Sequence, residues 1–136
     1  MESRYLHRGK RIDNREWVEG FLFMVNDVPY ILPHHKTGQP IHADNLLKTA
    51  VEVLKDTVCR CTGQYDKNGK LIWENDIANC MDAECCGYIS WNESEAGFYF
   101  DVLLEDGRFE EEHIYDYQDC MEVIGNNFDN PELLEV

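Results

Sequence analysis

The run from Thr62 to Ile77 constrains the fold of this chain most, because it specifies two turns and parts of three strands in a short stretch. Asn68-Gly69 is a strong two-residue hairpin signal, and we expect a type I′ turn in which both residues take a positive φ. Leu71–Trp73 follows as a bulky, β-favouring strand. Glu74–Asp76 then turns the chain into the next strand, so the run predicts a fold built from short hairpins.

Strand-like segments recur along the rest of the chain, separated by turn residues every 8–12 residues or so. Before the run they are Tyr5–Arg11, Trp17–Val25, Val28–Leu32, Val51–Leu54 and Thr57–Thr62. After it they are Ile77–Met81, Gly87–Trp91, Phe98–Leu104, Arg108–Tyr115 and Cys120–Ile124, with Asp106-Gly107 as a second hairpin turn. The pattern predicts an all-β barrel or sandwich.

The remaining segments are predicted to be loops or single helical turns. Pro33–Ile41 and Asp82–Cys86 are expected loops, and Pro131–Leu134 is expected to be a docked tail or one helical turn. Asp44 is a candidate cap for a short helix through Lys48, although a strand over Leu47–Leu54 is the competing interpretation.

Length and hydropathy limit the domain organisation. The 136 residues fit one domain, which we expect over residues 1–136, or two subdomains that divide near residues 62–76. A hydrophobic content of 43% supports a packed core. The longest apolar run, Phe21–Val25, is far shorter than the roughly 18 residues of a membrane helix. Residues 1–8 lack an apolar signal core, so we expect a soluble, cytoplasmic protein.

The net charge of −15 is unevenly distributed. Residues 1–70 carry 11 Lys/Arg against 9 Asp/Glu, whereas residues 71–136 carry only Arg108 against 18 Asp/Glu, a net charge of −17. This charge disfavours binding to DNA, RNA or an anionic membrane, and it permits a basic protein partner. The plainer interpretation is a very soluble surface, which is the usual meaning of charge runs.

Six cysteines raise the question of a metal site or a nucleophile, and they are Cys59, Cys61, Cys80, Cys85, Cys86 and Cys120. Without a secretion signal we expect free thiols. Zinc sites usually combine two short chelating pairs, and here Cys80-x4-Cys85 has no second pair, even with His34, His35 and His42 available. We therefore predict no metal and no cofactor.

Catalytic patterns are equally weak. A Cys–His pair would need His35 or His113 beside a thiol, and no local motif marks one, so buried structural thiols are the better interpretation. The many carboxylates of residues 74–135 single out no acid–base pair. Phosphate-binding glycine motifs are absent from the sequence. We predict no catalytic residues, and a small hydrolase or thiol enzyme is the least favoured function.

Nucleic-acid readout has two candidate features. The aromatic residues Phe98, Tyr99, Phe100 and Phe109 resemble a base-stacking platform, but they lie in the acidic half, so core packing is preferred for at least one face of them. The basic residues near the N-terminus are interrupted by Asp13, Glu16 and Glu19, which indicates a solvated strand edge. Glu110–Glu112, near Asp116 and Asp119, leave open the alternative of an acidic mimic of nucleic acid.

Three groups of residues, in order along nearly the whole chain, resemble the YopX-like family of phage proteins. They are Arg4–Arg11 with Trp17–Gly20, then Val58–Gly63 with Asp66–Lys70 and Ile72–Ile77, and finally Val123–Asn126 with Asn130–Leu134. The resemblance implies a phage or prophage protein, mostly β, with small SH3-like barrel subdomains. It implies no established activity and no catalytic residues.

Two positions depart from the family pattern. Cys59-Arg60-Cys61 stands where the family usually has a Gly-Gln-aromatic run, so the cysteines are a feature of this chain. Asn75 stands where the family usually has glycine, and we expect its turn to survive because Asn tolerates left-handed backbone.

These observations lead to one functional prediction and one main alternative. We expect a non-enzymatic, cytoplasmic, phage-encoded accessory protein that contacts a host or phage protein, a basic one being electrostatically allowed. The expected contact surface lies in the acidic strands between Asp82 and Asp119. Direct nucleic-acid binding and membrane binding are not expected, and self-association stays open. The alternative is an acidic DNA mimic that inhibits a host nucleic-acid-binding enzyme.

Overall fold

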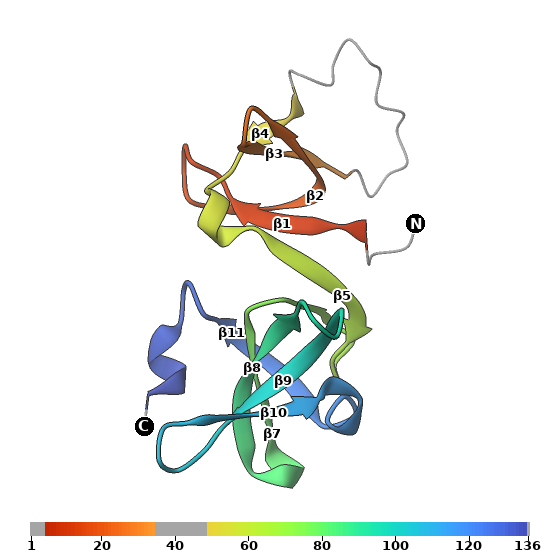
Figure 1. Ribbon diagram of the computed structural model, residues 1–136, viewed down its shortest axis with the longest axis vertical. Coiled ribbons are helices and arrows are strands. Elements are labelled where there is room, and N and C mark those ends of the chain that lie inside the picture. Colours follow the sequence, from red (N-terminus) through yellow and green to blue (C-terminus); the bar gives the residue numbers. More distant parts are fainter. Residues whose placement is uncertain (1–4, 35–48, 136) are drawn as a thin grey trace. The chain divides into compact units, whose positions relative to one another are not determined.

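The computed structural model describes residues 5–34 and 49–135, and these residues are mainly β, in antiparallel sheets joined by short turns (Figure 1). The chain divides into two compact units, Met1–Cys61 and Thr62–Val136. The predicted β fold class is confirmed. The expected loop from Pro33 and the short helix from Asp44 fall largely outside the described residues, as do His35 and His42.

The first unit contains the strands β4-β3-β2-β1-β5 of a six-stranded sheet whose order ends with β6 (Leu71–Trp73). Its strands and turn are β1 (His7–Lys10), β2 (Trp17–Val25), β3 (Val28–Pro33), β4 (Val51–Glu52), the 3-10 turn η3 (Lys55–Thr57) and the first part of β5 (Cys59–Tyr65). An isolated bridge also joins Arg11 to Val53. The buried side chains include Leu6, Ile31, Val53, Cys59 and Cys61.

The second unit is a five-stranded antiparallel sheet in the order β10-β9-β8-β7-β11. Its elements are β6 (Leu71–Trp73), β7 (Asp76–Cys80), η4 (Met81–Ala83), β8 (Cys85–Asn92), β9 (Gly97–Leu103), β10 (Phe109–His113), η5 (Ile114–Asp116), β11 (Met121–Asn126) and η6 (Pro131–Leu134). One face of the sheet supplies Ala78, Ile89, Phe100 and Met121 to a core that also includes Ile72 of β6, and each of these residues is completely buried.

Two local predictions are wrong, each for a reason visible in the hydrogen bonding. Asp82–Cys86 is not one loop, because Cys85 pairs directly with Cys80 and thereby begins β8. The turn at Asn68-Gly69 is not type I′, since only Gly69 takes a positive φ, of 80°. The N–H of Asp66 donates to the carbonyl of Lys70 at 2.8 Å, which closes a three-residue loop of the kind that places one glycine in the left-handed region.

The chain does contain a two-residue turn with both φ values positive, at Asn26 (51°) and Asp27 (66°) between β2 and β3. At the other end of this hairpin, the backbone of β3 comes very close to Gly20, since a Cβ at Gly20 would lie 2.0 Å from the carbonyl oxygen of Leu32. A side chain at this position would therefore separate β2 from β3.

Candidate interaction surface

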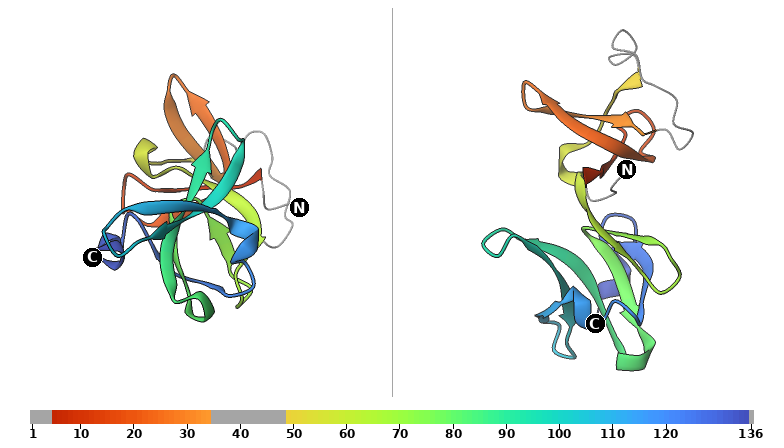
Figure 2. Two further views of the ribbon diagram at one scale, coloured as in Figure 1. Left: turned by 60° about the horizontal axis from the view of Figure 1, so that its bottom comes forward. Right: turned by 90° about the vertical axis from the view of Figure 1, so that its right-hand side faces the viewer.

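The second sheet has an outer face, opposite its core, across β8, β9 and β10. Figure 2 shows the backbone from two further directions. Successive side chains of a strand point to opposite faces of the sheet. Because Ile89 and Phe100 are completely buried in the core, the residues before and after each of them lie on the outer side. Strand register then aligns the outer residues in two rows, Tyr88–Asp101–Glu111 and Ser90–Tyr99–His113. We call these six residues the outer face.

Asp101 is the centre of the first row. Its carboxylate accepts a hydrogen bond from Ser90 Oγ at 3.1 Å, and its charge acts on the Tyr88 hydroxyl. Burial, followed by the Asp101 charge, raises the pKa of Tyr88 to about 12. The Tyr88 ring also packs edge-on against Phe109, with the ring centroids 5.1 Å apart. The carboxylate of Asp101 is therefore oriented by the neutral hydroxyl of Ser90 and lies beside the packed Tyr88 and Phe109 rings.

The second row is organised around Tyr99. Its hydroxyl donates to Glu95 Oε2 at 2.8 Å, and this hydrogen bond raises the pKa of Tyr99. The Tyr99 ring lies 5.2 Å from the His113 ring. At the rim, Asn92 Nδ2 donates to Glu111 Oε1 at 3.2 Å. Here too the partners of the carboxylates are uncharged.

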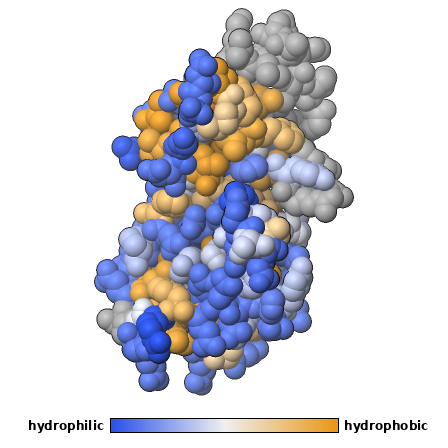
Figure 3. Space-filling model, in the orientation of Figure 1, coloured by the Kyte–Doolittle hydropathy of each residue, from blue (hydrophilic) through white to orange (hydrophobic). Residues whose placement is uncertain are grey.

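Cations of this half of the chain do not neutralise the outer face. Arg108 is the only Lys or Arg in residues 71–136, and its Nε lies 2.6 Å from Asp106 in the β9–β10 turn. Within residues 5–34 and 49–135, no ion pair reaches Asp101 or Glu111. Figure 3 shows hydrophilic residues over most of the visible face of the second unit. The outer face thus presents anionic acceptors beside aromatic rings.

The aromatic residues proposed as a stacking platform are split between the two faces of the sheet. Phe100 is completely buried in the core and Phe98 packs against it. Tyr99 belongs to the outer face and contacts His113, and Phe109 lies on the same side of the sheet against Tyr88. Core packing for one face, as predicted, is confirmed.

The thiols form an unforeseen group at the edge of the same core. Cys80 and Cys85 are cross-strand partners, and the sulfurs of Cys80 and Cys120 both donate to the Tyr117 carbonyl, at 3.6 and 3.3 Å. Burial raises the pKa of Cys80 far above its ordinary value, with the neighbouring thiols adding to the effect. Burial also raises the pKa of Cys85. Raised pKa values keep these sulfurs as thiols, which is unfavourable for nucleophilic attack.

The other sequence candidates for metal or thiol chemistry are dispersed. All six cysteines are free, and Cys59 and Cys61 are buried in the first unit with Arg60 exposed between them. His113 contacts the Tyr99 ring. His34 Nε2 lies 3.9 Å from Glu19. Among the described residues, no three His, Cys, Asp or Glu side chains are arranged to hold a metal ion.

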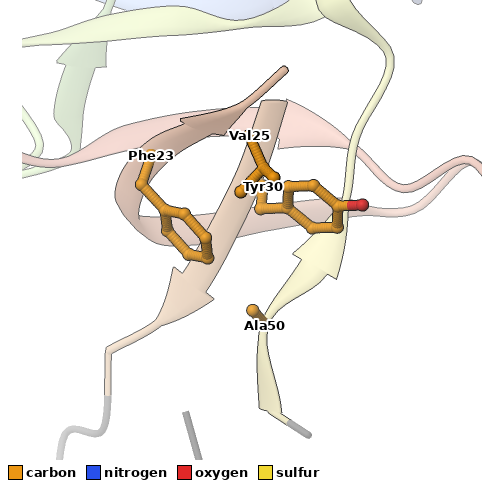
Figure 4. Close-up of a pocket in the computed structure, with 4 residues that line it drawn as sticks. All are labelled: Phe23, Val25, Tyr30 and Ala50. Atoms are coloured by element: carbon orange, nitrogen blue, oxygen red, sulfur yellow. The ribbon is translucent and has the colours of Figure 1, made fainter. Parts of the chain in front are cut away.

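A cavity of about 230 Å³ lies on the first unit, lined by Phe23, Val25, Tyr30 and Ala50 (Figure 4). The rings of Phe23 and Tyr30 stack with centroids 5.6 Å apart at an interplanar angle of 17°. Among the described residues, the lining side chains offer one hydroxyl and are otherwise apolar, which suits packing rather than chemistry. The sequence predicts strands at Phe23, Val25 and Tyr30, leaves Ala50 between the competing helix and strand interpretations, and gives no signal of a cavity.

Asp66, in the middle of the Thr62–Ile77 run, is 6% exposed and binds three backbone N–H groups. Oδ1 accepts from Asn68 and Lys70, each at 2.9 Å, and Oδ2 accepts from Val123 at 3.0 Å. Burial opposes ionisation, but the donors of Val123, Lys70 and Asn68 outweigh it and lower the pKa of Asp66. This residue ties the β5–β6 hairpin to β11.

Asn75 and Asp76 have similar structural roles. Asp76 is 2% exposed and accepts from the Trp73 N–H at 2.8 Å. Asn75 takes a φ of 70°, which confirms that asparagine keeps the left-handed turn there. Its carbonyl accepts from the Asn127 N–H at 2.9 Å, and its side chain accepts from Asn127 Nδ2 at 3.2 Å. The recognisable residues of the Thr62–Ile77 run therefore stabilise turns and connect strands.

Comparison with known proteins gives one positive result. The family described as YopX protein matches residues 8–135, nearly the whole chain. Among curated proteins, none matches. No helix in the part of the chain that the structure describes is long and apolar enough to cross a membrane.

Proposed function

Because this chain belongs to the YopX family, we propose that it is a phage-type accessory protein that acts in the bacterial cytoplasm by contacting another protein, without catalysis. The observation that carries the proposal is the outer face, where Asp101 and Glu111 are oriented by neutral donors and remain free of cationic partners among the described residues. A partner with a basic surface fits this arrangement.

The physical argument concerns preorganisation and charge. Charge-assisted hydrogen bonds to a Lys or Arg are stronger than neutral ones, and carboxylates already held in place lose little side-chain entropy on binding. Tyrosine rings such as that of Tyr88, which is partly exposed, are enriched at protein interfaces because they combine apolar area with a polar end. The net charge of −17 over residues 71–136 would also accelerate encounter with a basic partner.

The absence of catalysis is proposed on chemical grounds. The clustered thiols of Cys80 and Cys85 have raised pKa values, which disfavour the reactive thiolate. The carboxylates of Asp66 and Asp76 accept hydrogen bonds from backbone N–H groups and serve the fold. The cavity at Phe23 and Tyr30 has an apolar lining.

The test is capture of partners from a host extract by the tagged protein, with quantification by mass spectrometry. We expect a basic protein that binds at low salt and is lost at about 0.5 M salt, where charges are screened within a few ångströms. The double variant Asp101→Asn/Glu111→Gln should lose it. The control Asp13→Asn/Glu16→Gln makes the same charge change on exposed residues of the first unit and should retain it.

Three outcomes would contradict the proposal: no specific partner, a partner indifferent to salt, or equal loss in the control variant. If the captured partner is a nucleic-acid-binding enzyme and DNA competes for it, the contact is of the mimicry kind. Competition by DNA is therefore the measurement that separates general protein contact from nucleic-acid mimicry.

We also propose that the first unit is a small SH3-like barrel, as the family resemblance implies. In support, the N–H of Leu54 donates to the backbone carbonyl of Lys10 at 2.8 Å, and the N–H of Ile12 donates to the backbone carbonyl of Glu52 at 3.2 Å. These two hydrogen bonds flank the Arg11–Val53 bridge. The turn η3 then leads into β5. An experimental structure in which this pairing extends around the unit would support the barrel, and an open sheet would reject it.

A further inference from the structure

Strand β10 ends the second sheet, so one of its two long edges has no neighbouring strand among the residues that the structure describes. The N–H of Leu104 donates to Arg108 at 2.8 Å, which marks a hydrogen-bonded pair at the β9–β10 turn. Such pairs recur at every second residue of an antiparallel ladder. Glu110 and Glu112 therefore bond to β9, opposite Val102 and Phe100.

It follows that the backbone N–H and C=O groups of Phe109, Glu111 and His113 point away from β9. In residues 5–34 and 49–135, no turn, loop or side-chain hydrogen bond reaches these outward groups, apart from the His113 carbonyl, which is the acceptor that begins the 3-10 turn η5. All three residues are exposed. The edge thus offers alternating donors and acceptors in the spacing that an extended chain requires.

The side chains of β10 decide what kind of chain fits. Glu111 lies on the outer face beside Asp101, while Glu110 and Glu112 point to the opposite side of the sheet. A second copy of β10 would set carboxylates against carboxylates, which is unfavourable. A strand carrying Lys or Arg would instead place cations opposite carboxylates on both sides.

We propose that the free edge of β10 is a docking strand, which binds an extended Lys/Arg-rich segment of the partner through main-chain hydrogen bonds to Phe109, Glu111 and His113. The inference rests on the proposed function and specifies its partner. Main-chain pairing supplies affinity, as in other cases of strand addition, and alternate side chains supply specificity. Cations on one side of the added strand contact Glu111, and those on the other side contact Glu110 and Glu112.

Amide exchange measured by NMR tests the geometry with a synthetic probe, a peptide of alternating Lys and Val. In the free protein the amides of Phe109, Glu111 and His113 should exchange quickly, while those of Glu110 and Glu112 should be protected. The peptide should slow exchange at the three outward amides. Protection of Phe109, Glu111 and His113 before the peptide is added would overturn the proposal.

A second peptide separates strand pairing from simple charge attraction. It has the same sequence with every backbone N–H methylated, so its charge is kept and its main-chain donors are lost. We expect it to bind at least about tenfold more weakly, because several hydrogen bonds are removed. Equal binding of both peptides, or binding of neither, would overturn the docking strand.

Variants at one position complete the test with the whole protein. Glu111→Pro removes an outward N–H and leaves the β9 ladder intact, since proline is tolerated on a free edge. Glu111→Gln keeps that N–H and removes only the charge. In the proline variant the peptide should neither bind nor slow amide exchange. In the glutamine variant the peptide should bind more weakly, mainly at low salt.

The outcomes distinguish this inference from the function on which it rests. If a basic partner is captured and lost by Asp101→Asn/Glu111→Gln but binds Glu111→Pro normally, the docking strand fails and the acidic contact surface stands. Light scattering measures whether a second copy of the chain binds the edge of β10 and forms a dimer. A dimer that Glu111→Pro dissociates would identify a second copy on the edge and overturn the proposal.

Discussion

Replacing Asp66 by alanine should destabilise the second unit strongly, because one carboxylate serves three backbone donors from two distant parts of the chain. Loss of the acceptor is most costly for the N–H of Val123, since Val123 is 9% exposed and this N–H donates to Asp66 Oδ2. The donors of Asn68 and Lys70 lie in an exposed turn, where water replaces the carboxylate.

The magnitude follows from these two environments. A buried donor left unsatisfied costs about 1–3 kcal/mol, and each hydrogen bond replaced by water costs about 0.5–1.5 kcal/mol. Together the loss should be about 3–4 kcal/mol in the free energy of unfolding, a large part of the roughly 5–15 kcal/mol typical of a small domain. Asp66→Asn retains an acceptor oxygen and should fall between the alanine variant and the natural protein.

Urea unfolding followed by the fluorescence of Trp73 and Trp91 measures this loss. Asp13→Ala is the control, because Asp13 is exposed and changes of that kind usually stay within about 0.5 kcal/mol. The pKa of Asp66 is lowered in the folded state, so its stabilisation is present above the unfolded pKa of about 3.9 and is lost as pH falls through the folded pKa. A loss below about 1 kcal/mol at neutral pH would refute the role of this carboxylate.

Three further measurements examine other parts of the second unit. Gly125→Ala should cost about 1–3 kcal/mol in unfolding free energy, because its Cβ would lie 2.5 Å from Asn130 Oδ1; an unchanged urea midpoint would contradict this crowding. Cys80, completely buried with a raised pKa, should react with a thiol reagent at pH 8 only after unfolding, and rapid labelling of the native protein would show that the thiol is accessible. Absorbance titration should show one tyrosine ionising near pH 12, absent in Tyr88→Phe; ionisation of Tyr88 near its ordinary pKa would contradict its burial beside Asp101.

Strand positions were largely predictable because alternation and turn residues are local signals. Leu71–Trp73 and Trp17–Val25 have the predicted bounds. The turn at Asn68-Gly69 differs because a distant contact decides it: Asp66 binds Asn68 and Lys70 while also binding Val123. No local pattern of residues reports that third hydrogen bond.

The candidate surface was predictable only as a region. The charge of residues 71–136 pointed to the acidic strands, but charge alone does not say which carboxylates share a face. Strand register supplies that information, by aligning Tyr88 with Asp101 and Glu111. The contact of Cys80 with Cys85 and Cys120 was missed for the same reason, since it depends on the pairing of β7 with β8 and β11.

Asp66 and Glu111 show why the most recognisable residues of this chain are not those expected to bind a partner. Asp66 is buried and accepts hydrogen bonds from the backbone, so its removal should unfold the unit. Glu111 is exposed, and its carboxylate accepts a hydrogen bond from the neutral side-chain amide of Asn92. Its neutralisation should leave the unfolding free energy within about 0.5 kcal/mol, as for most surface changes. Stability and partner binding are therefore separable, and a Glu111→Gln variant that folds normally but loses the partner would assign the contact to this face.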